Sequence, residues 1–136
     1  MFTDTSKIAD ARGGEISMLD LWGQWQSAPA TFNPKHPGSG GGAFISSMEK
    51  REGAFLVRLT LTDGRSLVCG EGSRLALDSG GWAGAGLDHD GLTLRTDAGP
   101  VAVQSMEPAG LGDVWMLTLS SSPHMVLVDG VWFVTE

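Results

Sequence analysis

The chain has 136 residues, so a single domain is expected. Its share of 41% hydrophobic and 18% charged residues is typical of a globular protein, and 20 glycines, 6 prolines and no tyrosine indicate many turns and little helix. A net charge of −7 speaks against a surface that binds nucleic acid, because affinity for phosphate rests on Lys and Arg.

Cys69 is the single cysteine, which excludes an intrachain disulfide and a thiolate metal cage. The sequence from Met1 to Lys7 lacks the basic and apolar regions of a signal peptide, so secretion by such a signal is not expected. No apolar run approaches the roughly 20 residues that cross a bilayer. These features predict a soluble, mainly β domain.

The first expected element is a short helical turn over Ser17 to Gln26, where apolar residues recur at helical spacing. Pro34 to Gly42 is rich in Pro and Gly and is expected to form a flexible surface loop. Phe55 to Thr62 alternates between two faces, which predicts a strand, and Asp63-Gly64 predicts a tight turn into a return strand, Arg65 to Cys69. The face of the first strand that is expected to point inward carries Phe55, Val57, Leu59 and Leu61.

Further short strands are expected downstream, and Asp129-Gly130 predicts a second tight turn between the last two. These strands are Arg74 to Leu77, Gly91 to Thr96, Val101 to Met106, Val114 to Leu119, Met125 to Val128 and Val131 to Val134. Strands at a spacing of about ten residues, separated by turn residues, are typical of an all-β sandwich or barrel. A weak internal echo between Leu59–Val68 and Leu92–Val103 fits either a pseudo-twofold fold or two ordinary hairpins.

Four stretches in a fixed order carry a resemblance to a known family. The sequence from Asp113 to Glu136 reads as a strand, a Pro-His corner, an apolar strand, an Asp-Gly turn and a last strand, and Leu59 to Leu77 reads as a hairpin. Together with Asp4 to Leu21 and Gly80 to Leu94, they resemble the Hint family, the fold shared by inteins and hedgehog autoprocessing domains. The resemblance covers nearly the whole chain and implies one all-β domain over residues 1–136, a pseudo-twofold bundle of short curved antiparallel strands.

The chemistry of that family uses a Cys or Ser at the first position, a Thr and a His on the central strand, and a terminal His-Asn pair. The resemblance places Met1 at the first position, Gly70 and Ser73 at the central ones, and Val134 and Thr135 at the end. None of the five has the family's side chain, so they are interpreted as degenerate family positions. No enzymatic activity is therefore expected.

Other candidate sites have simpler interpretations. Cys69 is expected to be a buried residue of the core. Asp88-His89-Asp90 is interpreted as a solvated turn rather than a metal site, because adjacent strand residues point to opposite faces. Trp132 and Val134 share one apolar face of the last strand, and Val131 and Phe133 share the other. One face should meet the core, and Trp132 and Val134 are the candidate contact with a partner.

The main hypothesis from the sequence is a non-enzymatic structural or protein-interaction module on an inactive Hint-like scaffold. Small stand-alone Hint-like proteins occur in tailed-phage genomes, so the resemblance implies a virion or accessory protein of a phage, in the virion or the host cytoplasm. Expected partners are other protein subunits or further copies of this chain, without nucleic acid, membrane or cofactor. Two alternatives stay open: a Hint domain that cleaves or splices itself, and a β module that binds a small ligand or glycan.

Overall fold

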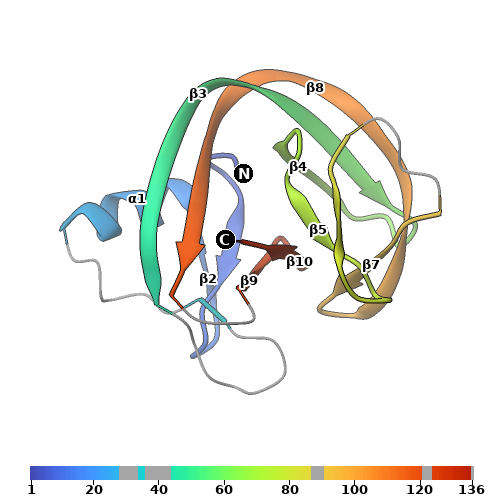
Figure 1. The fold of residues 1–136 in the computed structure, drawn as a ribbon, viewed down its shortest axis with the longest axis horizontal. Helices are drawn as coiled ribbons and strands as arrows, with labels where there is room; N and C mark the ends of the chain where they lie inside the picture. The colour runs from blue at the N-terminus through green and yellow to red at the C-terminus, as the bar shows by residue number, and fades with distance from the viewer. Residues whose placement is uncertain (28–33, 36–43, 87–90, 121–123, 136) are drawn as a thin grey trace.

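The computed structural model describes residues 1–27, 34–35, 44–86, 91–120 and 124–135. Antiparallel strands make up most of these residues, which confirms the predicted all-β class (Figure 1). In chain order the elements are β1 (Lys7–Ala9), β2 (Glu15–Ser17), α1 (Met18–Ser27), β3 (Ile45–Leu61), β4 (Ser66–Gly70), β5 (Arg74–Ala76), β6 (Trp82–Gly84), β7 (Thr93–Thr96), β8 (Gly99–Leu119), β9 (Met125–Val128) and β10 (Val131–Val134). No helix in the described ranges has the length and apolar character that crossing a membrane requires.

Two long strands, β3 and β8, arch over the rest of the molecule (Figure 1). They pair antiparallel from Ile45 opposite Leu119 to Leu61 opposite Val103, and four irregularities interrupt their register. Such irregularities bend strands, which allows strands of 17 and 21 residues to curve around a core. The sequence predicted β8 as two separate strands, because Pro108 to Gly112 contains no alternating pattern to join them.

Phe55 departs from the predicted burial of its strand. Val57, Leu59 and Leu61 are buried as expected, whereas Phe55 is 68% exposed. Phe55 pairs with Leu111 of β8, which is 64% exposed, so this stretch of the two strands extends beyond the core that covers Val57.

Both predicted Asp-Gly turns are present. Gly64 has a φ of +93°, and the N–H of Leu61 donates to the carbonyl of Arg65, so the first turn is a three-residue loop closed by a left-handed glycine. Asp129 and Gly130 have φ values of 51° and 80°, the pair of left-handed residues that a two-residue primed turn requires. This second turn joins β9 to β10.

The predicted helical turn is the ten-residue helix α1. The hydroxyl of Ser17 accepts a hydrogen bond of 3.2 Å from the N–H of Asp20, which caps the helix start. Met18 and Leu21 are buried in the core. The expected loop Pro34 to Gly42 is described only at its start, where the N–H of Lys35 donates to the carbonyl of Ala9, so the flexibility of the loop stays a prediction.

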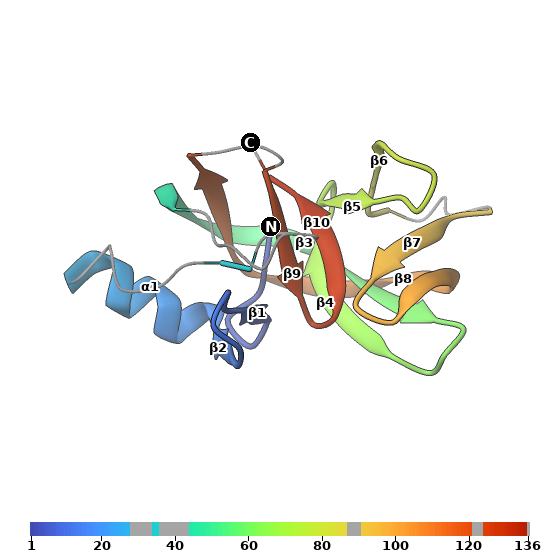
Figure 2. The same cartoon turned by 90° about the horizontal axis from the view of Figure 1, so that it is seen from below.

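Strand β10 is central to the core because it pairs with β5, β7 and β9. The N-terminal segment enters beside it: Phe2 forms antiparallel bridges to Cys69 of β4 and to Trp115 of β8. The ring of Phe2 meets that of Phe133 edge to face, with centroids 5.1 Å apart. These contacts bring the beginning of the chain next to its last strand (Figure 2).

Candidate functional site

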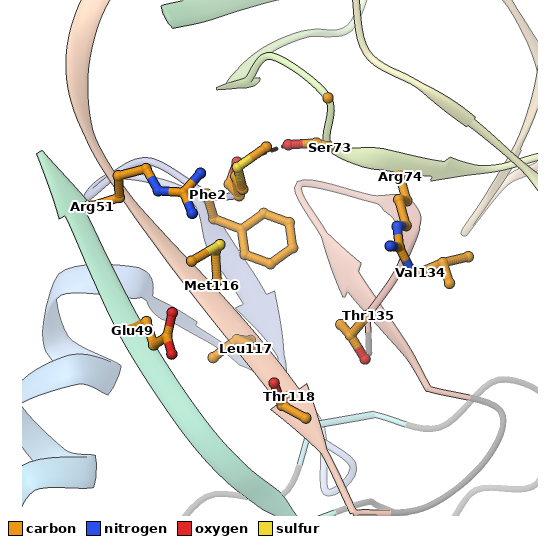
Figure 3. Close-up of a pocket in the computed structure, with 12 residues that line it drawn as sticks. Phe2, Glu49, Arg51, Ser73, Arg74, Met116, Leu117, Thr118, Val134 and Thr135 are labelled. Carbon is orange, nitrogen blue, oxygen red and sulfur yellow. Dashed lines mark hydrogen bonds between the residues drawn. The ribbon is translucent and has the colours of Figure 1, made fainter. Parts of the chain in front are cut away.

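A cavity of about 310 Å³ lies where the first and the last described residues meet (Figure 3). Its walls come from β3, β8, the start of β5 and both ends of the described chain. The residues that line it are Met1, Phe2, Glu49, Arg51, Gly72, Ser73, Arg74, Met116, Leu117, Thr118, Val134 and Thr135. Four of the five positions that the family resemblance singled out, Met1, Ser73, Val134 and Thr135, therefore surround one space, and the fifth, Gly70, binds Met1.

The carbonyl oxygen of Met1 is held by two donors. The backbone N–H of Gly70 donates to it over 2.8 Å, and the buried hydroxyl of Ser73 lies 3.1 Å from it. The same hydroxyl is 2.7 Å from the carbonyl of Gly70, and its single proton serves one of these oxygens at a time. Two donors that converge on a carbonyl both fix its position and polarise it.

Gly70 is required by the close approach of Met1 rather than by its own backbone angles. A Cβ at Gly70 would lie 2.8 Å from the Cβ of Met1 and 3.3 Å from a methyl group of Val114. The threonine that the family carries at this position would therefore clash with Met1. Glycine here is consistent with methionine at the first position.

Cys69 directly precedes Gly70 in β4, next to the two hydrogen bonds that hold the Met1 carbonyl. Its side chain is 1% exposed and belongs to the main core cluster, as the sequence suggested. Burial raises the pKa of the thiol, and the positive charge of the Met1 amino group and the Ser73 side chain partly oppose this effect. The bridge between Phe2 and Cys69 places this thiol-bearing residue beside the first residues of the chain, a relationship that composition and spacing do not reveal.

The amino group of Met1 is itself withdrawn from water. Burial lowers its pKa from 8.0 to about 6, although the neighbouring Cys69 partly opposes the shift. At neutral pH the nitrogen is therefore mostly uncharged, and it sits next to a mostly protonated thiol.

On the other side of the cavity, Thr135 is tied to the corner residue His124. The N–H and the hydroxyl of Thr135 donate to the carbonyl of His124 over 2.6 Å and 3.0 Å. His124 has a φ of 56° and contributes its backbone to these contacts. Val134 pairs with Arg74 of β5, and this pairing holds the end of β10 at the edge of the cavity.

Asp88, His89 and Asp90, interpreted above as a solvated turn rather than a metal site, lie outside the described residues. Within the described part of the chain, no group of three or more His, Cys, Asp and Glu side chains is arranged to hold a metal ion.

Trp132 differs from the expectation of an open outer face. It is only 6% exposed, because Ala9, Ala76 and Leu127 form a second small cluster around it. Val134 on the same face is half-buried and lines the cavity. The alternation of faces is as predicted, but the chain itself covers the Trp132 side. A contact of Trp132 and Val134 with a partner, a phage particle as the assembly, and a location in the virion or host cytoplasm stay predictions.

The glycan-binding alternative depended on a concave cluster of exposed tryptophans. All five tryptophans lie in the described ranges, and Trp82 is the only one with an exposed side chain, at 50%. Its ring stacks under the guanidinium of Arg74, 4.8 Å away. The tryptophans therefore do not form such a cluster.

Glu49 and Arg51 are the site residues that the sequence reasoning missed. They lie in the first part of β3, upstream of the predicted strand. Their spacing of two residues places both side chains on one face of a strand, and this was the available signal.

Comparison with known proteins supports the fold. No protein family model and no curated protein matches the sequence. Among solved structures, the VidaL intein superposes with a TM-score of 0.82 at 17% identity, over 98% of this chain and 95% of the intein. A DnaB intein from a Synechocystis species gives 0.75 at 18% identity, over 99% and 97%. A bacterial intein-like domain from Clostridium thermocellum gives 0.76 at 16%, over 98% and 97%.

These matches correct one expectation. The sequence predicts a protein that is not an enzyme, but the solved structures named above, which match along nearly the whole chain, are two inteins, which are self-splicing, and an intein-like domain. At such low identity the likeness establishes the architecture: the protein has the Hint fold of inteins and intein-like domains.

Proposed function

We propose that the protein is a self-processing Hint domain in which the thiol of Cys69 attacks the peptide bond that joins Met1 to a preceding polypeptide. The observation that carries the proposal is the position of Met1. Its carbonyl is held by Gly70 and Ser73 over 2.8 Å and 3.1 Å, and the residue after it, Phe2, is bridged to Cys69. The thiol of the neighbouring strand takes the place of the nucleophile that the family carries at the first position.

The proposed step is an acyl transfer from nitrogen to sulfur. The sulfur of Cys69 forms a bond to the carbonyl carbon of the residue before Met1, and the bond from that carbon to the Met1 nitrogen breaks. The thiol proton goes to the nitrogen, which leaves as the free amine of Met1. The preceding polypeptide remains on Cys69 as a thioester, and water then releases it as a carboxylic acid.

Two electrostatic features of the site act on this step in opposite directions. The raised pKa of the buried Cys69 thiol makes the reactive thiolate scarce at neutral pH, so the reaction should be slow and should accelerate as the pH rises. The Met1 amine, with its pKa of about 6, is a weaker base than an ordinary amine and hence a better leaving group. Burial thus slows the attack by the Cys69 thiolate and favours the departure of the Met1 amine.

The test is a fusion in which a stable reporter domain is joined to Met1 through a neutral linker. We expect slow release of the reporter and a new chain beginning at Met1, detected by intact-mass spectrometry. Hydroxylamine or an added thiol should accelerate release, because both cleave thioesters. Since Cys69 is the single cysteine, C69A should abolish release, and C69S should slow it by forming an ester.

Two serine variants test the hydrogen bonds that hold the Met1 carbonyl. S73A removes a hydroxyl that contacts Met1 and should slow release, whereas S66A removes an exposed hydroxyl from β4 and should leave release unchanged. Circular dichroism and thermal unfolding verify that each variant folds. The proposal is wrong if the folded fusion releases no reporter and forms no hydroxylamine-sensitive species.

A further inference from the structure

We infer that the protein binds the residues before Met1 as an added strand on β8, and that the backbone N–H of Leu117 holds the carbonyl oxygen of the peptide bond to be cleaved. The inference rests on the proposed function for the identity of its substrate, a polypeptide joined to Met1. It adds how this polypeptide is bound and which donor faces the reacting carbonyl. Three observations carry it: the pairing of Phe2, the regular register of β8 and the space beside Leu117.

Phe2 and Trp115 form a hydrogen-bonded antiparallel pair. The N–H of Phe2 donates to the carbonyl of Trp115 over 2.9 Å, and the N–H of Trp115 donates to the carbonyl of Phe2 over 2.8 Å. In an antiparallel ladder such pairs recur at every second residue, backward along one strand and forward along the other. The next pair therefore joins Leu117 to the residue directly before Met1.

The register of β8 is regular up to this point. From Val114 to Thr118, each residue of β8 pairs with one residue of β3, and no irregularity interrupts the series. Since the backbone groups of Trp115 point to Phe2, those of Leu117 point to the same side, away from β3. In the described part of the chain, no residue forms a backbone hydrogen bond with Leu117 on that side.

The space on that side of Leu117 is the cavity of about 310 Å³, which Leu117 lines (Figure 3). A polypeptide that continues the N-terminal segment in extended form enters this space and closes two hydrogen bonds with Leu117. Its last side chain lies on the face of Phe2 and Leu117, which are both buried, so the tests below place alanine there. Pairing of this kind binds the main chain of a peptide and accepts many sequences.

The pairing gives the N–H of Leu117 a direct role in the reaction. Successive carbonyls of the N-terminal segment alternate in direction, since that of Met1 points to β4 and that of Phe2 points to β8. The carbonyl before Met1 therefore points to β8 and accepts from Leu117, while the thiol of Cys69 comes from β4. When sulfur attacks the carbon, negative charge develops on this oxygen until the bond to the Met1 nitrogen breaks, and a fixed N–H donor stabilises that charge.

Amide hydrogen exchange tests the pairing without any reaction. The full chain with C69A, which cannot form the thioester, is compared with and without a short neutral extension that ends in alanine directly before Met1. With the extension, exchange at the N–H of Leu117 should slow about threefold to tenfold, because this N–H gains a hydrogen bond. The N–H of Val114 points to β3, so its exchange should stay the same.

Replacement of a single backbone atom tests the role in the reaction. In the reporter fusion that retains Cys69, Leu117 is replaced by its α-hydroxy acid analogue, which puts an ester oxygen in place of the N–H. Loss of this donor should slow release of the reporter about a hundredfold. The same replacement at Val114 removes an N–H that points to β3, and it should leave the release rate of the folded fusion unchanged. Circular dichroism verifies that both analogues fold.

The outcomes separate the added strand from the processing step. Unchanged exchange at Leu117 overturns the inference, and the proposed function stands if the fusion still releases its reporter. Slower exchange in the C69A chain, without release from the fusion that retains Cys69, supports the added strand and overturns the processing step. Slower exchange together with a release rate that the Leu117 analogue does not change overturns the role of this N–H as donor to the reacting carbonyl.

Discussion

The backbone N–H of Gly70 donates a hydrogen bond of 2.8 Å to the carbonyl oxygen of Met1, and no side chain fits between the two residues. The ideal Cβ of Gly70 would stand 2.8 Å from the Cβ of Met1, closer than real Cβ atoms approach one another. The first residues of the chain are thus built into the sheet between β4 and β8. This contact ties the proposed chemistry to the packing of the fold.

Replacement of Gly70 by alanine should displace Met1. We expect G70A to lower the free energy of unfolding by about 1–3 kcal/mol, the usual cost of adding a methyl group to a packed site. Urea denaturation measures this value. The matched control is G86A, because a Cβ at Gly86 would meet no atom within 4 Å. Equal stability of G70A and the unmodified protein would show that the N-terminal segment is not held as described.

Gly23 offers a prediction of the opposite sign. It lies in the interior of α1, and a Cβ there would meet nothing within 4 Å. Glycine inside a helix costs roughly 0.5–1 kcal/mol relative to alanine, so G23A should raise the free energy of unfolding by about that amount. For comparison, G13A should destabilise, because Gly13 has a φ of +100° that alanine adopts with strain. A loss of stability in G23A would contradict the open space that surrounds Gly23 in the structure.

The sequence could predict those parts of the fold that depend on neighbouring residues. Asp129-Gly130 forms its turn because both residues tolerate a positive φ, and this preference is local. Phe55 shares the alternating face of Val57 but pairs with the exposed Leu111 of β8, a strand far away in the sequence, so alternation alone could not predict its exposure. Long-range pairing decides such details, and the sequence pattern does not contain them.

The same distinction applies to the site. The resemblance placed Met1 and Ser73 among the chemical positions of one family, and the fold brings them within 3.1 Å. The position of Cys69 beside the first residues of the chain depends on the bridge that Phe2 forms to β4, which no local pattern indicates. Arg51 was missed because its strand extends beyond the alternating segment.

Asp129 should make stability depend on pH. Its carboxylate accepts a hydrogen bond of 3.0 Å from the N–H of Lys7, but burial raises its pKa above the ordinary value of 3.8. A raised pKa in the folded state means that the stability present below the ordinary pKa is lost as the pH rises through the folded value. D129N keeps the acceptor and tolerates the φ of 51°, so it should match the unmodified protein in acid and be more stable at neutral pH.

Urea denaturation between pH 3 and pH 8 measures this difference. D63N is the control of opposite sign, because backbone and side-chain hydrogen bonds from Arg65 lower the pKa of Asp63. The contribution of Asp63 is present above its ordinary pKa and is lost as the pH falls, so D63N should weaken the protein most at neutral pH. Parallel pH profiles for D129N and the unmodified protein would contradict the burial of the Asp129 charge.

The contact of Phe2 with Phe133 should couple the two ends of the chain. The rings meet edge to face at 5.1 Å and 89°, and Phe133 is 1% exposed in the central strand β10. Truncation of a buried phenylalanine costs about 3–5 kcal/mol, so F133A should lose that much of a total stability of about 5–15 kcal/mol and should unfold at moderate urea. F2L and F133L are milder changes, and a double-mutant cycle between them should give a coupling of about 0.5–1.5 kcal/mol. If the two losses simply add, the N-terminal segment is not packed on β10, and the cavity that both ends line would have another shape.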